Sequence, residues 1–257
     1  MLSIDERFLI DHVVGQRWFA SKAREVIGAR VVDRVDVAPR LTLLLVEIRF
    51  PEGTHDVYQL LAGTRDGEPD WSDGFADPTL ARELVHEIRS GSTKQTDEGV
   101  IDFRTLEGYA ALGRELDRVD IVTSEQSNSS VIFDEELILK VFRRLEAGVN
   151  PELEMLRFLT EHGFQNLASL VGWYVYVGRP LDATLGILQR YVANAVNGWD
   201  LGLDELGAAP ERFLGRLHRL GEVTAEMHNV LASDANDPAF APEETRDRKS
   251  TRLNSSH

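Results

Sequence analysis

The sequence predicts an α+β fold, because segments of strand character and segments of helical periodicity follow one another along its 257 residues. In the first third, apolar and β-branched runs are separated by proline and glycine turn formers. Near the middle, polar turns alternate with strand-like runs and lead into a helix that starts at an Asn-Pro pair. Towards the end, residues 211–231 carry apolar side chains at helical spacing. With 42% hydrophobic residues, the chain can bury a substantial core.

The N-terminal elements are a helix, a small antiparallel sheet and a second helix. The first helix is expected at residues 3–14, with Ser3 as its N-cap and Gly15 at its end. Three strands, separated by proline-containing turns, are predicted at residues 29–37, 41–50 and 57–61. A helix at 78–89 precedes a polar loop at 91–99, and this loop divides two subdomains near residue 98.

The remaining elements place one helix between two groups of strands. Residues 101–111 and 115–120 fit strands or short turns, and clearer strands are predicted at 121–124, 131–133, 137–142, 171–177 and 184–191. The intervening helix has Asn150 as N-cap and Pro151 at its first position, and it ends at Gly163. Two more helices are expected at 198–206 and 211–231.

Charge and composition narrow the classes of partner and compartment. The net charge is −15, and the 28 basic residues are scattered, which argues against binding nucleic acid by phosphate neutralisation. The chain has no cysteine, which excludes disulfides and thiolate sites and suits a reducing cytosol. Its longest apolar runs, such as 41–46, are far shorter than the roughly 20 residues of a membrane span. We therefore expect a cytoplasmic protein without nucleic-acid or membrane partners.

The last eleven residues, 247–257, are interpreted as foreign to the protein. Back-translated, they read like a sequencing-library adapter carried into the reading frame, so we exclude them from the fold and expect them to be unpacked. The native segment then ends near Arg246. Motifs that are missing from the sequence are accordingly expected to lie beyond this point.

Lys140 is the residue with the clearest chemical implication. It lies in an apolar strand between Leu139 and Val141, where its charge is costly unless an anion meets it. Phosphates and the glutamate Glu154, in the helix that follows, could supply that charge. The preceding polar turn could hold phosphate through hydroxyl and backbone N–H groups of Ser127, Asn128, Ser129 and Ser130. The G-x-x-x-x-G-K-[ST] pattern does not occur, which excludes a P-loop enzyme.

A strand, a polar turn, a strand with a lysine and a helix with an early glutamate follow the order of a protein-kinase N-lobe. Residues 125–130, 137–146 and 150–154 resemble the corresponding segments of bacterial maltokinases, including those fused to trehalose synthase. This family belongs to the aminoglycoside-phosphotransferase branch of the kinase-like fold. Three further segments are similar and occur in the same order: 16–22, 189–199 and 224–228. The resemblance covers residues 2–246, although Ser21 and Ala23 replace glycines that are usual there.

The resemblance implies a protein-kinase-like N-lobe with an N-terminal cap subdomain and a partial, mainly helical C-lobe. The implied boundaries are 1–98 for the cap, 99–192 for the N-lobe with its hinge, and 193–246 for the start of the C-lobe. Lys140 would contact the α and β phosphates of ATP, Glu154 would orient it, and the turn residues would cover the phosphates. Backbone groups of Arg190, Tyr191 and Val192 would bind adenine. The catalytic aspartate and the Mg²⁺ ligands are expected beyond this chain.

The implied activity is ATP-dependent phosphorylation of maltose to maltose 1-phosphate, in glycogen and α-glucan biosynthesis. This fragment alone would be inactive, although it could retain weak affinity for ATP. Two alternatives stay open: a kinase of another small acceptor such as glucosamine, and a non-catalytic nucleotide-binding module. Association or fusion with trehalose synthase is open as well.

Several other motifs favour structural roles. Residues 101–103, Ile-Asp-Phe, look like a kinase magnesium motif but precede Lys140, where that motif does not belong. His162-Gly163 resembles the start of a catalytic loop, yet Phe164 stands in place of the aspartate, so we interpret Gly163 as a helix end. Trp18 and Phe19 are interpreted as core aromatics rather than as sugar-stacking residues.

Overall fold

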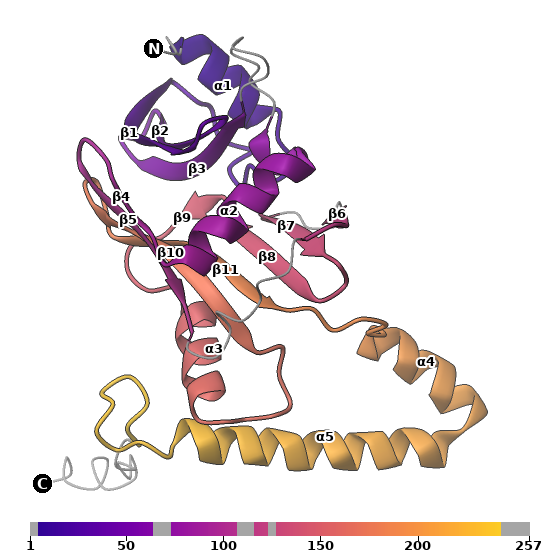
Figure 1. The fold of residues 1–257 in the computed structure, drawn as a ribbon. Helices are drawn as coiled ribbons and strands as arrows, with labels where there is room; N and C mark the ends of the chain where they lie inside the picture. The colour runs from indigo at the N-terminus through magenta and orange to yellow at the C-terminus, as the bar shows by residue number, and fades with distance from the viewer. Residues whose placement is uncertain (1–4, 64–72, 107–115, 123–126, 243–257) are drawn as a thin grey trace, which may run out of the picture. The chain divides into compact units, whose positions relative to one another are not determined.

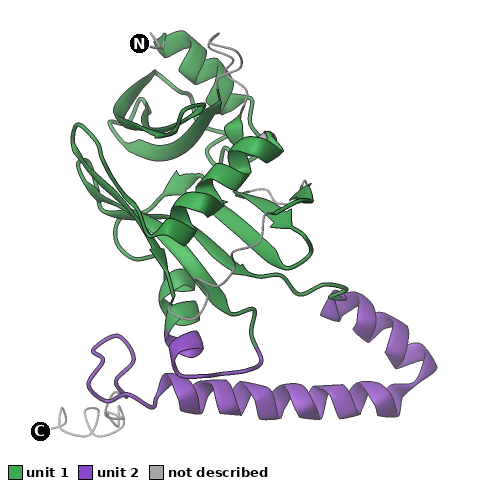
Figure 2. Ribbon diagram, viewed as in Figure 1, with its two compact units in different colours: residues 1–157, 167–195 green, residues 158–166, 196–257 purple. Residues whose placement is uncertain are grey.

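The computed structural model describes residues 5–63, 73–106, 116–122 and 127–242 (Figure 1). These residues form helices and two antiparallel sheets, which confirms the predicted α+β class. The chain divides into two compact units (Figure 2). Unit 1 comprises residues 1–157 and 167–195, and unit 2 comprises residues 158–166 and 196–257. The tail at 247–257 lies outside the described residues, as do positions 107–111 and 123–126 of the predicted strands and turn.

The first sheet of unit 1 has four antiparallel strands in the order β1-β2-β3-β9. Three of them match the predicted strands closely, and the fourth is a two-residue strand from much later in the chain. Their bounds are β1 Gly28–Ala38, β2 Leu41–Arg49, β3 His55–Gly63 and β9 Arg144–Leu145. Strand β2 is buried on both faces: Leu43 and Leu45 belong to one hydrophobic cluster, and Leu44 and Val46 to another. This explains why its sequence is a continuous apolar run rather than an alternating one.

Helix α1, Glu6–Val14, contributes Leu9 and Val13 to the second of these clusters. The two residues are four positions apart and therefore share one helix face. The helix starts later than predicted, because Asp5 accepts the backbone N–H of Arg7 as N-cap. Ser3, the predicted cap, lies outside the described residues.

The second sheet of unit 1 has seven antiparallel strands in the order β4-β5-β10-β11-β8-β7-β6. Their bounds are β4 Thr93–Gln95, β5 Gly99–Thr105, β6 Val119–Val122, β7 Asn128–Phe133, β8 Leu137–Phe142, β10 Leu170–Gly178 and β11 Ala183–Arg190. The loop predicted at 91–99 is thus partly wrong, since β4 lies within it and pairs with β5.

Helix α2 and the first part of helix α3, up to residue 157, belong to unit 1 as well. Helix α2, Pro78–Ser90, is capped by Asp77 and ends at Gly91, whose φ of 62° is the left-handed conformation that glycine adopts readily. Its apolar face joins the core formed with β5 and its neighbours. The short 3₁₀ helix η1, Gly74–Ala76, precedes it. Helix α3, Pro151–Glu161, begins as predicted, with Asn150 accepting the backbone N–H of Glu152 at 2.9 Å.

In unit 2, helices α4, Gly198–Ala208, and α5, Pro210–Leu231, form a helical pair. The ring of Phe213 lies so close to Gly202 that a Cβ there would be only 3.2 Å from it. Glu205, buried on α4, forms ion pairs with Arg212 and Arg216 of α5. No residue of α5 is buried, and no helix of the described part of the chain is long and apolar enough to cross a membrane.

Candidate functional site

Lys140 lies on an interior strand of the larger sheet, and its ammonium group is held by a carboxylate. Strand β8 runs between β11 and β7, so Lys140 is flanked by Ile187 on one side and Ser130 on the other. Its Nζ donates to Oε2 of Glu152 at 2.7 Å, and its side chain is 22% exposed. The strand lysine therefore meets an anion, as the cost of desolvating its charge requires.

The prediction that Glu154 is the partner of Lys140 is wrong. Glu152 forms the ion pair because the Asn150 cap fixes the first helical turn of α3 beside β8. Residues two positions apart on a helix point in nearly opposite directions, so Glu154 cannot share this face. Sequence reasoning identified the correct helical turn and chose the wrong one of its two acids.

A cavity of about 470 Å³ is lined both by Glu152, the partner of Lys140, and by residues of the polar turn. Ser127 and Asn128 line it together with Glu152, and Trp18 and Arg144 also contribute to its walls. Ser127 is exposed and Asn128 is half-buried. Two of the four predicted turn residues are thus brought together with the carboxylate that holds Lys140.

Ser129 and Ser130 line a second cavity, of about 310 Å³, together with Arg143. Side chains alternate along β7, and Ser130 is the cross-strand neighbour of Lys140, so Ser129 points to the opposite face. The Ser129 hydroxyl accepts a hydrogen bond from Nε of Arg143 at 2.7 Å. The four turn residues therefore do not act as one set: the hydroxyl of Ser129 is directed away from Lys140.

The predicted hinge follows β11. The backbone N–H of Arg190 donates to the carbonyl of Ser169 at 2.9 Å, and that of Tyr191 donates to Glu136 at 2.8 Å. Both groups are thus already used within the protein. Val192 is 55% exposed, and its backbone N–H has no hydrogen-bond acceptor among the described residues. Within the predicted hinge, this N–H is the one left to meet a ligand.

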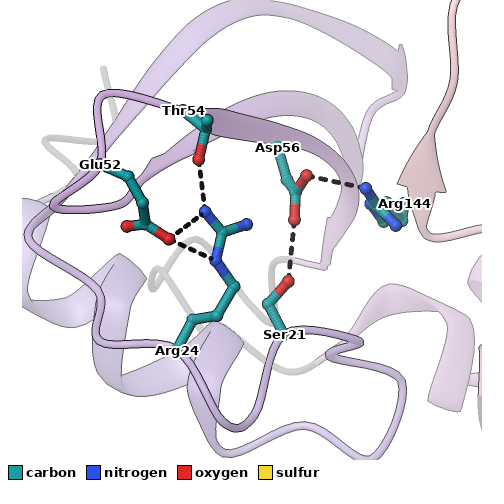
Figure 3. A network of polar contacts seen from close by, with 6 residues as sticks. All are labelled: Ser21, Arg24, Glu52, Thr54, Asp56 and Arg144. Atoms are coloured by element: carbon teal, nitrogen blue, oxygen red, sulfur yellow. Dashed lines mark hydrogen bonds and ion pairs between the residues drawn. The ribbon is translucent and has the colours of Figure 1, made fainter.

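Two polar clusters connect the segment around Ser21 to β3 and to the turn that precedes it (Figure 3). Asp56 accepts a hydrogen bond from the Ser21 hydroxyl at 3.0 Å and forms an ion pair with Arg144 of β9 at 3.0 Å. Arg24 contacts both Glu52, at 2.8 Å, and the Thr54 hydroxyl. Ser21, which departs from the family pattern, therefore supplies a side-chain hydrogen bond that glycine could not.

Trp18 and Phe19 are core aromatics, as interpreted from the sequence. They are 5% and 2% exposed, and their ring centroids lie 5.8 and 5.6 Å from that of Tyr58. Burial raises the pKa of the Tyr58 hydroxyl. The Ile-Asp-Phe segment is also structural, since Asp102 pairs with Arg104 while its two neighbours are buried. Gly163 has a φ of 72° and follows α3, which supports its interpretation as a helix end.

Gln59 was not predicted and connects the two sheets. It is fully buried, and its amide donates to the carbonyls of Phe142 at 3.1 Å and Leu185 at 2.8 Å. Its side-chain oxygen accepts the Tyr174 hydroxyl at 2.9 Å, and burial raises the pKa of that hydroxyl far above its usual value. A polar residue in the middle of an apolar strand was the available signal.

Comparison with known proteins places these features in a family context. Residues 12–92 match the family model of the maltokinase N-terminal cap domain. The structure of a glucosamine kinase in complex with glucosamine, ADP and inorganic phosphate is similar to this chain, with a TM-score of 0.60 and 18% identity over 87% of this chain and 51% of that one. Crystal form B of glucosamine kinase gives a TM-score of 0.60 at 19% identity, with the same coverage. The chain spans about half the length of these structures, and the likeness shows a shared protein-kinase-like fold.

Proposed function

We propose that this maltokinase-like protein of the protein-kinase-like fold supplies the cap and the nucleotide-binding lobe of an ATP-dependent sugar kinase that converts maltose to maltose 1-phosphate. The observation that carries the proposal is the Lys140–Glu152 ion pair, at 2.7 Å, with Glu152 on the wall of a cavity that Ser127 and Asn128 also line. Kinases hold nucleotide phosphates with a strand lysine that is positioned by a carboxylate and lies near a polar turn.

In this proposal Lys140 contacts the α and β phosphates and Glu152 orients it. An ammonium group has three donors, and one of them is directed at Glu152, so two remain for phosphate oxygens. Ser127 and Asn128 cover the phosphates through their side chains and backbone. Ser129 contributes through its backbone, since its hydroxyl is bound to Arg143.

Adenine is proposed to bind at the other end of the same strands. Arg190, the first hinge residue, pairs with Leu137, and Ile187 pairs with Lys140, so the hinge begins three residues along β11 from the level of the lysine, and Val192 follows two residues later. At 3.2–3.4 Å per residue the three-residue separation is on the order of 10 Å. A nucleotide extended along the strands can therefore place its base at Val192, whose N–H is available to it, and its phosphates at Lys140.

The match of the cap to the maltokinase model favours maltose as the acceptor. Glucosamine is the second candidate, because the similar solved structure holds glucosamine with ADP. Mg²⁺ is the proposed metal cofactor of the reaction, and the described residues contain no group of three or more histidines and carboxylates that could hold a metal. A cytoplasmic location, a role in α-glucan synthesis and association with trehalose synthase are part of the same proposal.

The test is to incubate the full-length protein that contains this chain with ATP, Mg²⁺ and either maltose or glucosamine, and to measure the sugar phosphate directly. Maltose 1-phosphate should form, and Lys140→Met should lower its rate by roughly 100-fold or more. Lys94→Met is the matched control, because Lys94 pairs with Glu87 at 3.0 Å in the same unit and is not placed at the cavity. Transfer to glucosamine alone would move the function to the second candidate.

The assignment of the carboxylate is tested in the same assay. Glu152→Gln should raise the KM for ATP and lower kcat, whereas Glu154→Gln should change both far less. The reverse order would restore the sequence-based assignment of Glu154. ATP binding without transfer to any sugar would indicate a non-catalytic nucleotide-binding module.

A further inference from the structure

We infer that Arg143 is a positioning residue that transmits the conformation of the N-terminal cap to the start of strand β7. Its consequence for nucleotide binding rests on the function proposed above, whereas the mechanical link itself does not. Arg143 follows the lysine strand directly and is 1% exposed. Nothing in its sequence context distinguishes it from Arg144, which is 45% exposed at its side chain.

The contacts of Arg143 reach in two directions. Towards the N-lobe, Nε donates to Oγ of Ser129 at 2.7 Å. Towards the cap, Nη2 forms an ion pair with Oδ2 of Asp73 at 2.5 Å. The guanidinium also lies 5.2 Å from the ring centroid of Trp18 and 5.5 Å from that of Phe75. The same planar group therefore holds an acid and two aromatic rings of the N-terminal segment together with a hydroxyl of the phosphate-side strand.

Asp73 is itself fixed by the local structure that precedes helix α2. Its second oxygen, Oδ1, accepts the backbone N–H of Phe75 at 3.1 Å and caps helix η1. Because one carboxylate serves both bonds, a displacement of η1 moves the acceptor of Arg143. A buried guanidinium that loses its anion is costly unless it moves to another partner. Such a movement of Arg143 changes its hydrogen bond to the Ser129 hydroxyl.

The main chain at Arg143 is held independently of its side chain. The backbone N–H of Gln59 donates to the Arg143 carbonyl at 2.7 Å, and the Gln59 amide donates to the carbonyl of Phe142. Substitutions at Asp73 or Ser129 should therefore alter the guanidinium link and leave the junction of the sheets in place. Arg144 provides the contrast: its guanidinium pairs with Asp56 of β3 at 3.0 Å (Figure 3).

Ser129 follows directly after Asn128, which lines both cavities, so a displacement of Ser129 affects both. Its neighbour Asn128 lines the cavity next to Glu152, and Asn128 and Ser129 both line the cavity next to Asp73. A shift at Ser129 therefore changes the placement of Asn128 beside the phosphates. The cap, in this view, sets the shape of the nucleotide site from a distance.

The experiment uses the full-length protein and three variants: Asp73→Asn, Ser129→Ala and the double variant. Asp73→Asn removes the charge that faces Arg143 while an asparagine oxygen can still cap η1. Asp77→Asn is the matched control, because Asp77 caps helix α2 in the same way and its carboxylate accepts from Thr79 rather than from Arg143. Two quantities are measured: ADP affinity by calorimetry, and hydrogen exchange of the backbone amides at 127–130 without ligand.

Asp73→Asn should speed hydrogen exchange of the amides at 127–130 and raise the Kd for ADP by about 2- to 30-fold. Asp77→Asn should match the unmodified protein in exchange rate and in Kd. Because both side chains act through the same guanidinium, the effects of Asp73→Asn and Ser129→Ala on the Kd should not add. Unchanged exchange and affinity in Asp73→Asn, or additive effects in the double variant, would overturn the inference. If the unmodified protein binds no ADP, the proposed function fails, and the exchange at 127–130 alone decides whether the cap controls β7.

Discussion

Helices α2 in unit 1 and α5 in unit 2 have similar amphipathic patterns and opposite surroundings. On α2, Leu80, Leu84 and Ile88 are at most 2% exposed and belong to the main core. On α5, Leu214, Leu217 and Leu220 are 55%, 45% and 60% exposed. Each pattern predicts an apolar stripe correctly, yet the residues facing the stripe decide whether it is buried.

The difference extends to polar groups. In unit 1, Gln59 and Arg143 are buried and fully engaged with several strands. In unit 2, Glu205 is the buried acid that joins α4 to α5, and both its arginine partners are more than half exposed. The buried polar groups of unit 1 therefore connect elements that are distant in sequence, whereas Glu205 in unit 2 connects two consecutive helices.

The largest expected difference between the units is in the cost of truncating a leucine. Leu139→Ala should destabilise unit 1 by about 2–5 kcal/mol, because Leu139 is 0% exposed and a cavity would remain. Leu220→Ala in this chain should cost less than about 0.5 kcal/mol, since its side chain is already in solvent. Urea unfolding of both variants measures the two costs.

Equal costs for the two leucines would contradict the difference between α2 and α5, because they would mean that α5 is packed in solution. The same two substitutions can also be compared in the full-length protein. If further chain covers the stripe of α5, Leu220→Ala should become as costly there as a core substitution.

The second expected effect concerns buried amides. Gln59→Met should lower the free energy of unfolding by about 2–4 kcal/mol, because two carbonyls and the Tyr174 hydroxyl lose their partner. Gln165→Met is the unit 2 counterpart: Gln165 is exposed and makes one hydrogen bond, to the Gly163 carbonyl, so its loss should be within about 0.5 kcal/mol. Thermal unfolding followed by circular dichroism compares them, and a stable Gln59→Met variant would contradict the role of Gln59 as a connection between the sheets.

The smallest expected effect is a pH dependence of unit 1. Burial lowers the pKa of His12 below 6.5, nearby Arg143 lowers it further, and Asp73 opposes them. As the pH falls below 6.5, the unfolded chain takes up a proton that the folded chain resists, so the free energy of unfolding should decrease. His12→Gln should flatten this decrease, as urea titrations between pH 7.5 and the acid side of the transition would show. An unchanged slope would mean that other groups dominate the acid sensitivity.

Much of the local structure could be predicted from the sequence. The strands around 41–50 and 137–142, the Asn150 cap and the long helix at 211–231 follow from patterns within a few residues. The prediction that Lys140 meets an anion also follows from local sequence, because a charge in an apolar strand requires an opposite charge wherever the strand is placed. The order of these elements, together with the family resemblance, predicted the kinase-like fold.

Other features depended on the tertiary structure. The sequence alone could not choose between Glu152 and Glu154, since the choice depends on which face of α3 meets β8. It could not show that Arg143 is buried while Arg144 is half-exposed, or that Gln59 reaches Leu185 across 126 positions of the chain. Local sequence patterns predicted most of the strands and helices, although not β4 or β9, and indicated which residue types need partners, because those properties are set by neighbours along the chain. Tertiary structure decided which partners they receive, because pairing and burial depend on contacts between residues that are distant in sequence.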